Sequence, residues 1–308
     1  MLKRLSLLCS VFLLPLGISG QSSAGTIVRV STTMGDYSIE LLDDVAPLTV
    51  QNFLNYVAKD DYNGTYLHRV VDSFVVQGGG YGFELFVGPI EIVADPPVPN
   101  EFNVSNTRGT VAMAKLDGDP DSATNQWFVS LADNSANLDN SNGGFTVFGN
   151  VLGDGMVILD AIDSLPTVEL GTNTPLAPFF TALYTNPLDL VYLNVEVVER
   201  FSGAPNVYEV NSGLLIASVS LDGGASIISV NFSTVSTAGE VVLQANPSSV
   251  IPRRDTVDGI ATFSNGDNRL RIPTLEVNDR GTVSLVTDVV LVLTDPERLQ
   301  FTLESFTQ

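Results

Sequence analysis

The segment from residue 66 to residue 80 constrains this chain more than any other part of the sequence. It reads Tyr-Leu-His-Arg-Val-Val-Asp-Ser-Phe-Val-Val-Gln-Gly-Gly-Gly, so one basic side chain, Arg69, stands inside an apolar and aromatic run. Phe74 follows five residues later, Gln77 three residues after that, and glycines end the segment. A cation in such surroundings either satisfies carbonyl or carboxylate groups of the fold or serves a functional site.

Short apolar runs separated by turn signals continue through the first two thirds of the chain. Pro47 begins a predicted helix whose apolar residues recur at helical spacing, and a second helix is expected from Gly155. Strands are expected over residues 26–31, 37–42, 70–77, 109–114, 126–131, 146–151 and 190–199. Many strands with two helices predict a mainly β fold, a closed antiparallel barrel capped by the two helices.

The last hundred residues have a different sequence pattern from the rest of the chain. Residues 201–205 read as a linker, which divides the chain into residues 25–201 and an all-β domain of unknown role at residues 202–308. Alternating or β-branched runs follow at residues 214–221, 227–235, 240–245, 282–293 and 299–306. Regular short strands with turn signals between them predict a small all-β domain of sandwich type.

Further segments of the first part add to the pattern of residues 66–80. They are Gly-Thr-Val-Ala-Met-Ala at 109–114, Asn-Gln-Trp-Phe-Val at 125–129, Leu-Asp at 138–139 and Phe-Thr-Val-Phe-Gly at 145–149. Together these segments resemble the bacterial, exported type of cyclophilins, the peptidyl-prolyl cis-trans isomerases, whose pattern includes F-H-R-V-x-x-x-F-x-x-Q-G-G. The resemblance covers about residues 26–201. The chain departs from the family pattern at Leu67, Val75, Lys115 and Trp127, and none of these replaces Arg69, Gln77 or Phe128.

The resemblance implies a cyclophilin-like β-barrel and a set of site residues. Arg69 would be the catalytic residue. Phe128 would form the floor of a proline pocket with Phe74 and Leu138, while Gln77 and the backbone around Lys115 would hold substrate carbonyls. The complete set expected to bind substrate is Phe74, Val75, Gln77, Ala114, Lys115, Phe128, Leu138 and Phe145.

Rotation about an X-Pro bond needs no covalent chemistry and no proton transfer, so no cofactor is expected. The barrier is near 20 kcal/mol because the amide must lose its double-bond character. A cation near the prolyl nitrogen opposes that resonance, and arginine suits the task because it is always charged and carries a rigid fork of donors.

Two other features are interpreted as structural. His68 is the only histidine and cannot build a metal site by itself. Residues 117–121, Asp-Gly-Asp-Pro-Asp, lack the glycine and the distal glutamate of a calcium loop, so a solvated acidic loop is expected and no metal.

The N-terminus and the charge suggest where the chain works. Lys3 and Arg4 precede an apolar run over residues 5–18 and then small residues, which predicts a signal peptide over residues 1–24 and a periplasmic or secreted protein. Cys9, the only cysteine, lies inside that run, so the mature chain would have no disulfide. A net charge of −21 argues against nucleic acid as a partner, and no membrane association is expected after signal cleavage.

These observations favour a peptidyl-prolyl cis-trans isomerase that acts on proline-containing segments of unfolded or exported proteins. One alternative is a barrel that captures proline segments without turnover. Another is an adhesion or docking protein whose main function belongs to the C-terminal β-domain.

Overall fold

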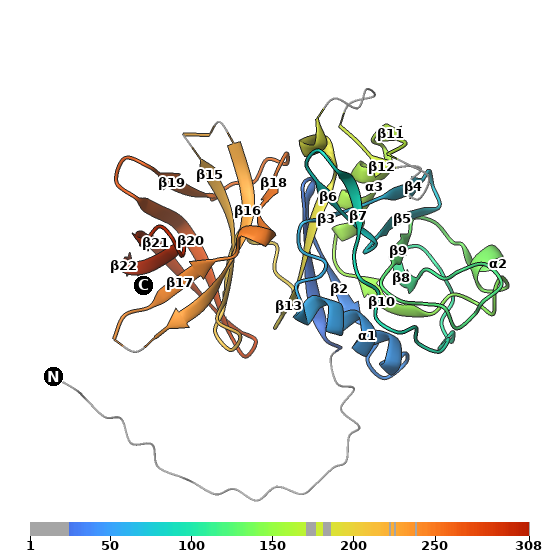
Figure 1. The fold of residues 1–308 in the computed structure, drawn as a ribbon. Coiled ribbons are helices and arrows are strands. Elements are labelled where there is room, and N and C mark those ends of the chain that lie inside the picture. The colour runs from blue at the N-terminus through green and yellow to red at the C-terminus, as the bar shows by residue number, and fades with distance from the viewer. Residues whose placement is uncertain are drawn as a thin grey trace, which may run out of the picture.

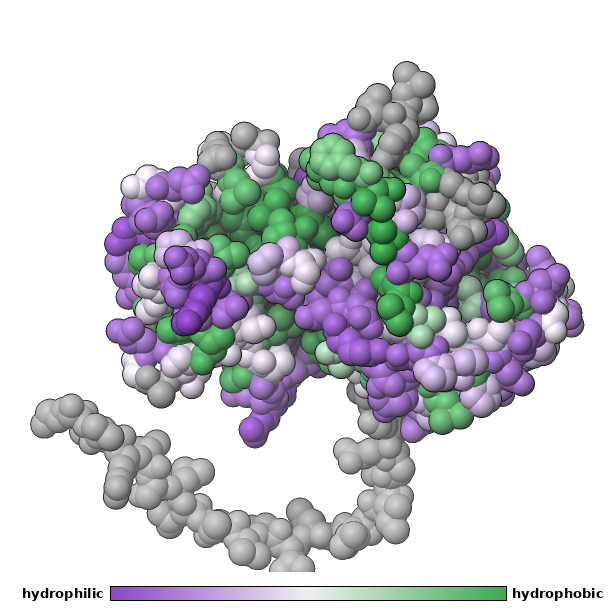
Figure 2. Space-filling model, in the orientation of Figure 1, coloured by the Kyte–Doolittle hydropathy of each residue, from purple (hydrophilic) through white to green (hydrophobic). Residues whose placement is uncertain are grey.

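The computed structural model describes residues 25–170, 177–180, 186–221, 223–224, 226–237 and 239–307, and it forms two β-rich halves that lie side by side (Figure 1). The predicted signal peptide, residues 1–24, lies outside the described residues. No helix within the described ranges is long and apolar enough to cross a membrane. Hydrophilic residues cover most of the visible face of the first half, while hydrophobic residues reach the surface of the second (Figure 2).

The first half contains an eleven-stranded antiparallel sheet and three α-helices. Its helices are α1 (Pro47–Ala58), α2 (Ser135–Leu138) and α3 (Gly155–Asp163). The strands of the sheet are β1 (Ile27–Thr32), β2 (Gly35–Leu41), β3 (Thr65–Tyr66), β4 (Arg69–Val71), β5 (Val75–Gly78), β6 (Tyr81–Glu84), β7 (Gly88–Glu91), β8 (Thr110–Met113), β9 (Trp127–Ser130), β10 (Val147–Val151) and β13 (Tyr192–Val198). A separate two-stranded sheet holds β11 (Thr167–Val168) and β12 (Ala177–Pro178), and a 3₁₀ turn, η1, covers Pro187–Asp189.

This sheet closes into a barrel through the segment that carries β3 and β4. The strand order is β4-β5-β9-β8-β10-β2-β1-β13-β3-β6-β7. The Leu67 amide donates to the Val191 carbonyl at 3.0 Å, and the next amide, that of His68, donates to the Gln77 carbonyl at 3.1 Å. One continuous segment therefore pairs with β13 at its start and with β5 at its end, which confirms the predicted closed antiparallel barrel.

Helix α1 covers the barrel with the face that the sequence predicts. Pro47 occupies the first turn, where its missing N–H costs nothing, and Val50, Phe53 and Val57 are buried. The ring of Phe53 lies 5.1 Å from that of Phe148 and 6.3 Å from that of Trp127, between ring centroids. These rings are part of the buried hydrophobic cluster that fills the first half.

The predicted strand at residues 70–77 is in fact a hairpin. β4 ends at Val71 and β5 begins at Val75, with Ser73 between them at a φ of 54°. The Phe74 amide donates to the Val71 carbonyl at 2.9 Å. The Asp-Ser pair forms the turn because short polar side chains tolerate this backbone conformation. The β-branched residues on both sides are typical of a continuous strand, so the sequence pattern does not indicate the turn.

Glycine is required where β5 ends. Gly79 has a φ of 81°, and a Cβ atom there would lie 2.5 Å from the Asn125 carbonyl oxygen and 2.8 Å from Cδ1 of Trp127. The chain then returns in the β6–β7 hairpin, which the sequence pattern did not predict. Its tip exposes Leu85, Phe86 and Val87.

The second half is all-β, as predicted, and its strands close into a barrel instead of packing as two sheets. Seven strands follow one another in a ring, β15-β19-β20-β21-β22-β17-β16, and β16 pairs with β15 to complete it. The strands of this half are β14 (Asn206–Glu209), β15 (Leu214–Leu221), β16 (Ser226–Ser236), β17 (Val242–Ala245), β18 (Ile251–Pro252), β19 (Ala261–Ser264), β20 (Arg269–Asp279), β21 (Thr282–Asp295) and β22 (Gln300–Thr307), with a 3₁₀ turn, η2, at Pro247–Ser249. Bulges in β16 and β21 give these long strands the twist that closure needs.

Each half has a hydrophobic core of its own, and the contact between the halves is polar. Arg253, whose side chain is 2% exposed, donates to both carboxylate oxygens of Asp36 at 2.9 and 3.0 Å and to Asp255. Arg29 also binds Asp36, at 2.6 Å. Burial by itself would raise the pKa of Asp36, but the charges of the two arginines outweigh it and lower that pKa to about 2. The domain boundary near residue 201 stays a prediction that separate cores favour.

Candidate active site

Arg69 stands at one end of a row of side chains that crosses four strands. In the sheet register Arg69 lies opposite Gln77, Gln77 opposite Phe128, and Phe128 opposite Ala112. Cross-strand partners project from the same face of a sheet, so the four side chains share one face. The sequence placed Arg69, Gln77 and Phe128 in one site, and the structure brings them together.

That face is the outside of the barrel. Val76 and Val129, the sequence neighbours of Gln77 and Phe128, lie in the main core with exposures of 0%. Because successive residues of a strand point to opposite faces, Gln77 and Phe128 must point outward. In Figure 1 the strands β4, β5 and β9 lie on the side of the first half that faces away from the second.

Arg69 keeps an unneutralised charge. Its side chain is half-buried, and its Nη1 donates to Oε1 of Gln77 at 3.1 Å. Burial lowers its pKa, and within the described ranges no carboxylate pairs with it. A guanidinium remains charged even so. The one partner of this cation among the described residues is a neutral side-chain amide beside an apolar cluster, and this arrangement favours the functional interpretation of Arg69.

A second amide holds Gln77 in place. Nε2 of Gln77 donates to Oε1 of Gln126 at 2.8 Å, so Arg69, Gln77 and Gln126 form a chain of hydrogen bonds. Gln126 was not among the predicted site residues. Its position two residues before Phe128 in the same strand pattern could have indicated it, since alternate residues share a face.

An apolar floor adjoins this chain of polar groups. Phe128, Val75 and Leu138 belong to one buried cluster with exposures of 2–6%, and Phe74 and Phe145 pack against it. The rings of Phe128 and Phe145 meet edge to face with centroids 5.8 Å apart. The side-chain amide of Asn134 donates to the Phe74 carbonyl at 2.9 Å and links the residue before α2 to the residue before β5. Ala114 packs against the same cluster, so all six predicted apolar residues lie together, and their contact with substrate stays a prediction.

The side chain of Lys115 binds backbone carbonyl groups at the edge of the site. Its Nζ donates to the carbonyl oxygens of Asn142 at 2.9 Å and Gly144 at 2.6 Å, and it lies 4.9 Å from the centroid of the Phe145 ring. Burial lowers the pKa of this lysine. The amide of Ala114, also predicted to line the site, already donates to the Gln126 carbonyl at 2.9 Å. The backbone donor of Ala114 is therefore already engaged within the barrel.

His68 lies next to Arg69 but in a different environment. It is 1% exposed, and its ring meets that of Tyr81 at 4.9 Å between centroids. Burial lowers its pKa to about 4, so the ring is neutral at physiological pH. This agrees with the structural role expected for it. Across the described ranges no group of three or more potential ligands is arranged to hold a metal ion.

The row of side chains defines a class of site, an outward-facing guanidinium beside an apolar floor on a closed barrel. Sequence comparison identifies the family. The profile of the cyclophilin type peptidyl-prolyl cis-trans isomerase/CLD family matches residues 27–179. The chain belongs to this family of isomerases, and the match ends before the second half begins.

Several bacterial relatives support the assignment. The chain is 39% identical to a peptidyl-prolyl cis-trans isomerase of Acinetobacter baylyi over 58% of its own length and 92% of the relative's. It is also 39% identical to peptidyl-prolyl cis-trans isomerase A of Dickeya dadantii, over 51% of this chain and 82% of the relative. It is 39% identical to peptidyl-prolyl cis-trans isomerase B of Escherichia coli over 47% of this chain and 88% of the relative. A solved cyclophilin type isomerase of Cryptosporidium parvum is 21% identical over 57% of this chain and 99% of its own, with a TM-score of 0.43.

Proposed function

We propose that Arg69 catalyses cis–trans isomerisation of X-Pro bonds in polypeptides bound on the outer face of the first barrel. The observation that carries this proposal is the guanidinium of Arg69, bound by the neutral Gln77 and by no described carboxylate, beside the buried cluster that contains Phe128. The apolar floor matches a proline ring, and the cation matches the prolyl nitrogen.

The mechanism follows from what changes during rotation. In the planar amide the lone pair of the prolyl nitrogen is delocalised, and in the twisted state it is localised and can accept a hydrogen bond. The guanidinium of Arg69 therefore interacts more strongly with the twisted state than with the planar one, which lowers the barrier. No proton is transferred, in keeping with a neutral, buried His68.

Gln77 acts as a positioning residue in this mechanism. Its Oε1 holds Nη1 of Arg69 at 3.1 Å, and its own Nε2 is directed toward Gln126. The second hydrogen of Nε2 remains for a substrate carbonyl, since an amide nitrogen carries two donors. The expected substrate contact of Gln77 is compatible with this second role.

We further propose that the substrates are proline-containing segments of unfolded or exported proteins, in the periplasm or outside the cell. The support for export is the charged and then apolar sequence of residues 1–24. The support for unfolded substrates is the position of the site on the surface of the barrel, where an extended chain can reach it. Fractionation of cells that express the full chain, with N-terminal sequencing of the product, tests export.

The catalytic proposal is tested by Arg69→Ala and Arg69→Lys. We expect Arg69→Ala to lower kcat/KM for a short X-Pro peptide by about two to three decades, or about 3–4 kcal/mol of transition-state stabilisation. Arg69→Lys should also be poor, because an ammonium lacks the planar fork of donors. The assay follows isomerisation of the peptide, with near-UV circular dichroism as the control for folding. Turnover at the wild-type rate by folded Arg69→Ala would exclude Arg69 as the catalytic residue. Binding of the peptide without turnover by the wild-type chain would leave a proline-binding module as the better description.

A further inference from the structure

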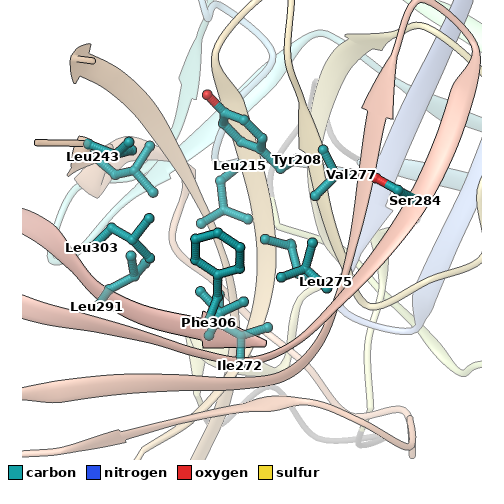
Figure 3. A pocket seen from close by; sticks show the side chains of 13 residues that line it. Tyr208, Leu215, Leu243, Ile272, Leu275, Val277, Ser284, Leu291, Leu303 and Phe306 are labelled. Carbon is teal, nitrogen blue, oxygen red and sulfur yellow. The ribbon is translucent and has the colours of Figure 1, made fainter. Parts of the chain in front are cut away.

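The C-terminal barrel contains an apolar cavity of about 280 Å³ (Figure 3). Leu215, Ile272 and Leu291 form its inner wall and are 0–2% exposed. Phe306 also lines it and is 48% exposed, so the cavity opens to solvent at this residue. Apolar cavities of about 150 Å³ in other proteins stay dry and bind molecules such as benzene. This cavity is larger, and an apolar group that entered it would leave water for a preformed apolar wall.

The polar groups of the lining do not select a charged ligand. The hydroxyl group of Tyr208 is within hydrogen-bond distance of Oγ1 of Thr234, at 3.0 Å, and Ser284 contributes the other hydroxyl group. Arg269 on β20 is bound by Glu304 on β22 at 2.6 Å. With a net charge of −21 the chain repels anions, so an apolar group that is neutral or positively charged fits the cavity best.

An open strand edge runs past the same cavity. The pairing of β22 with β17 ends at Thr302 opposite Val242, and the Leu303 amide donates to the Val241 carbonyl at 2.9 Å. Beyond this point the described residues of β22, Glu304–Thr307, pair only with β21. Among the described residues no strand pairs with the other edge of Glu304–Thr307, the stretch that includes Phe306 of the cavity lining.

An extended polypeptide satisfies both features at once. Its backbone can pair with an open strand edge while alternate side chains enter an adjoining pocket, which is a known mode of peptide recognition. A small apolar molecule would fill the cavity but would leave the strand edge unused. A folded partner would need a matching free edge of its own.

We propose that the C-terminal barrel binds an extended, apolar segment of unfolded polypeptide as an added strand at Glu304–Thr307, with one apolar side chain in the cavity. The biological part of this inference, that the segment belongs to a substrate of the first barrel, rests on the proposed function. The strands β4, β5 and β9, which carry Arg69, Gln77 and Phe128, lie on the side of the first half away from the second (Figure 1), so only a long substrate reaches both sites. Binding at the second site then raises the effective concentration of its prolines at the first.

The test measures binding directly and uses a probe without proline, so that it does not depend on isomerase activity. The probe is a short rhodamine-labelled peptide of alternating leucine and threonine with flanking lysines, titrated with the full chain by fluorescence anisotropy. We expect saturable binding that Phe306→Asp weakens at least about tenfold, because a carboxylate at the mouth must be desolvated when the side chain enters.

Matched variants make the result specific. Leu285→Asp introduces the same charge at another exposed apolar residue, 63% exposed and outside the cavity lining, and should bind the probe as the wild-type chain does. Ser284→Trp, which fills the mouth from an exposed position, should weaken binding as Phe306→Asp does and provides a second variant if the latter does not fold. A probe that is N-methylated at alternate residues should lose most of its affinity, because it cannot pair with the edge.

Three outcomes would overturn the proposal. The first is equal affinity of the wild-type chain and both cavity variants. The second is undiminished binding of the N-methylated probe, which would exclude strand addition. The third is tight binding of the neutral apolar dye N-phenyl-1-naphthylamine with no binding of the peptide, which would make the cavity a site for small molecules. If the peptide-binding proposal is overturned, the Arg69 assay still tests isomerase activity independently. If the Arg69 assay fails, the peptide-binding result still stands.

Discussion

Gln77→Glu is the sharpest test of whether the charge of Arg69 drives catalysis. The substitution changes one amide nitrogen to oxygen and keeps the shape of the side chain. It places a carboxylate where Oε1 of Gln77 now accepts from Nη1 of Arg69 at 3.1 Å. The guanidinium would keep its position, but a fixed counter-charge would replace a neutral acceptor.

The magnitude follows from that distance. Two unit charges 3.1 Å apart attract with about 5 kcal/mol at an effective dielectric constant of about 20. Desolvation of the new carboxylate offsets part of this attraction, and about 3 kcal/mol of the guanidinium's interaction with the twisted amide would be lost. Each 1.36 kcal/mol corresponds to about tenfold in rate, so we expect kcat/KM to fall by about two decades.

Gln77→Leu separates charge from positioning. It removes the hydrogen bond to Arg69 but adds no counter-charge, so a smaller loss of about tenfold is expected from poorer positioning. Both variants remove the Nε2 group of Gln77 that donates to Gln126, so the loss of this hydrogen bond is the same in the two variants. If Gln77→Leu were as slow as Gln77→Glu, position and not charge would explain the loss.

The pH profile completes the experiment. An arginine partner lowers the pKa of the new Glu below its usual value of about 4.3, so the carboxylate is charged at neutral pH. Activity of Gln77→Glu should therefore stay low at neutral pH and recover only below about pH 4, whereas Gln77→Leu should show no recovery. Exchange between the cis and trans peptide signals by NMR measures the rate at any pH without a coupling protease. Wild-type activity of Gln77→Glu at neutral pH would refute electrostatic catalysis by Arg69.

Two further predictions concern the contact between the halves and the independence of the first barrel. The pKa of Asp36 is lowered from 3.8 to about 2, so the stability it contributes, about 2 kcal/mol, is present above about pH 4 and lost as the pH falls toward 2. Arg253→Met should lower the free energy of unfolding at neutral pH by up to that amount, with little difference from wild type near pH 2; an equal urea midpoint at neutral pH would contradict this. Residues 25–201 alone should keep full activity on short X-Pro peptides, because the candidate site residues Arg69, Gln77 and Phe128 and the core around Phe53 lie entirely within them. An insoluble fragment, or one without near-UV circular dichroism, would show that this barrel depends on the second half.

The sequence by itself was enough to recognise the family of the first half and to name a candidate site. The spacing of Arg69, Phe74 and Gln77, with Phe128 farther along the chain, indicated the family and placed these residues in one site. Strand periodicity explains why this succeeds, since alternate residues of paired strands share a face once the register is known. The same reasoning could have found Gln126, which shares the outer face with Phe128.

Other features depended on contacts between residues far apart in the chain. The hairpin turn at Ser73 lies inside a β-branched run that is typical of a continuous strand. The alternating runs of the second half fit a sandwich and a barrel equally well, and only the pairing of β15 with both β16 and β19 closes the ring. Arg253 binds Asp36 from 217 residues away. Alternation tells which side chains are buried, but strand pairing, ion pairs and cavities are set by three-dimensional packing, and for these only the tertiary structure decides.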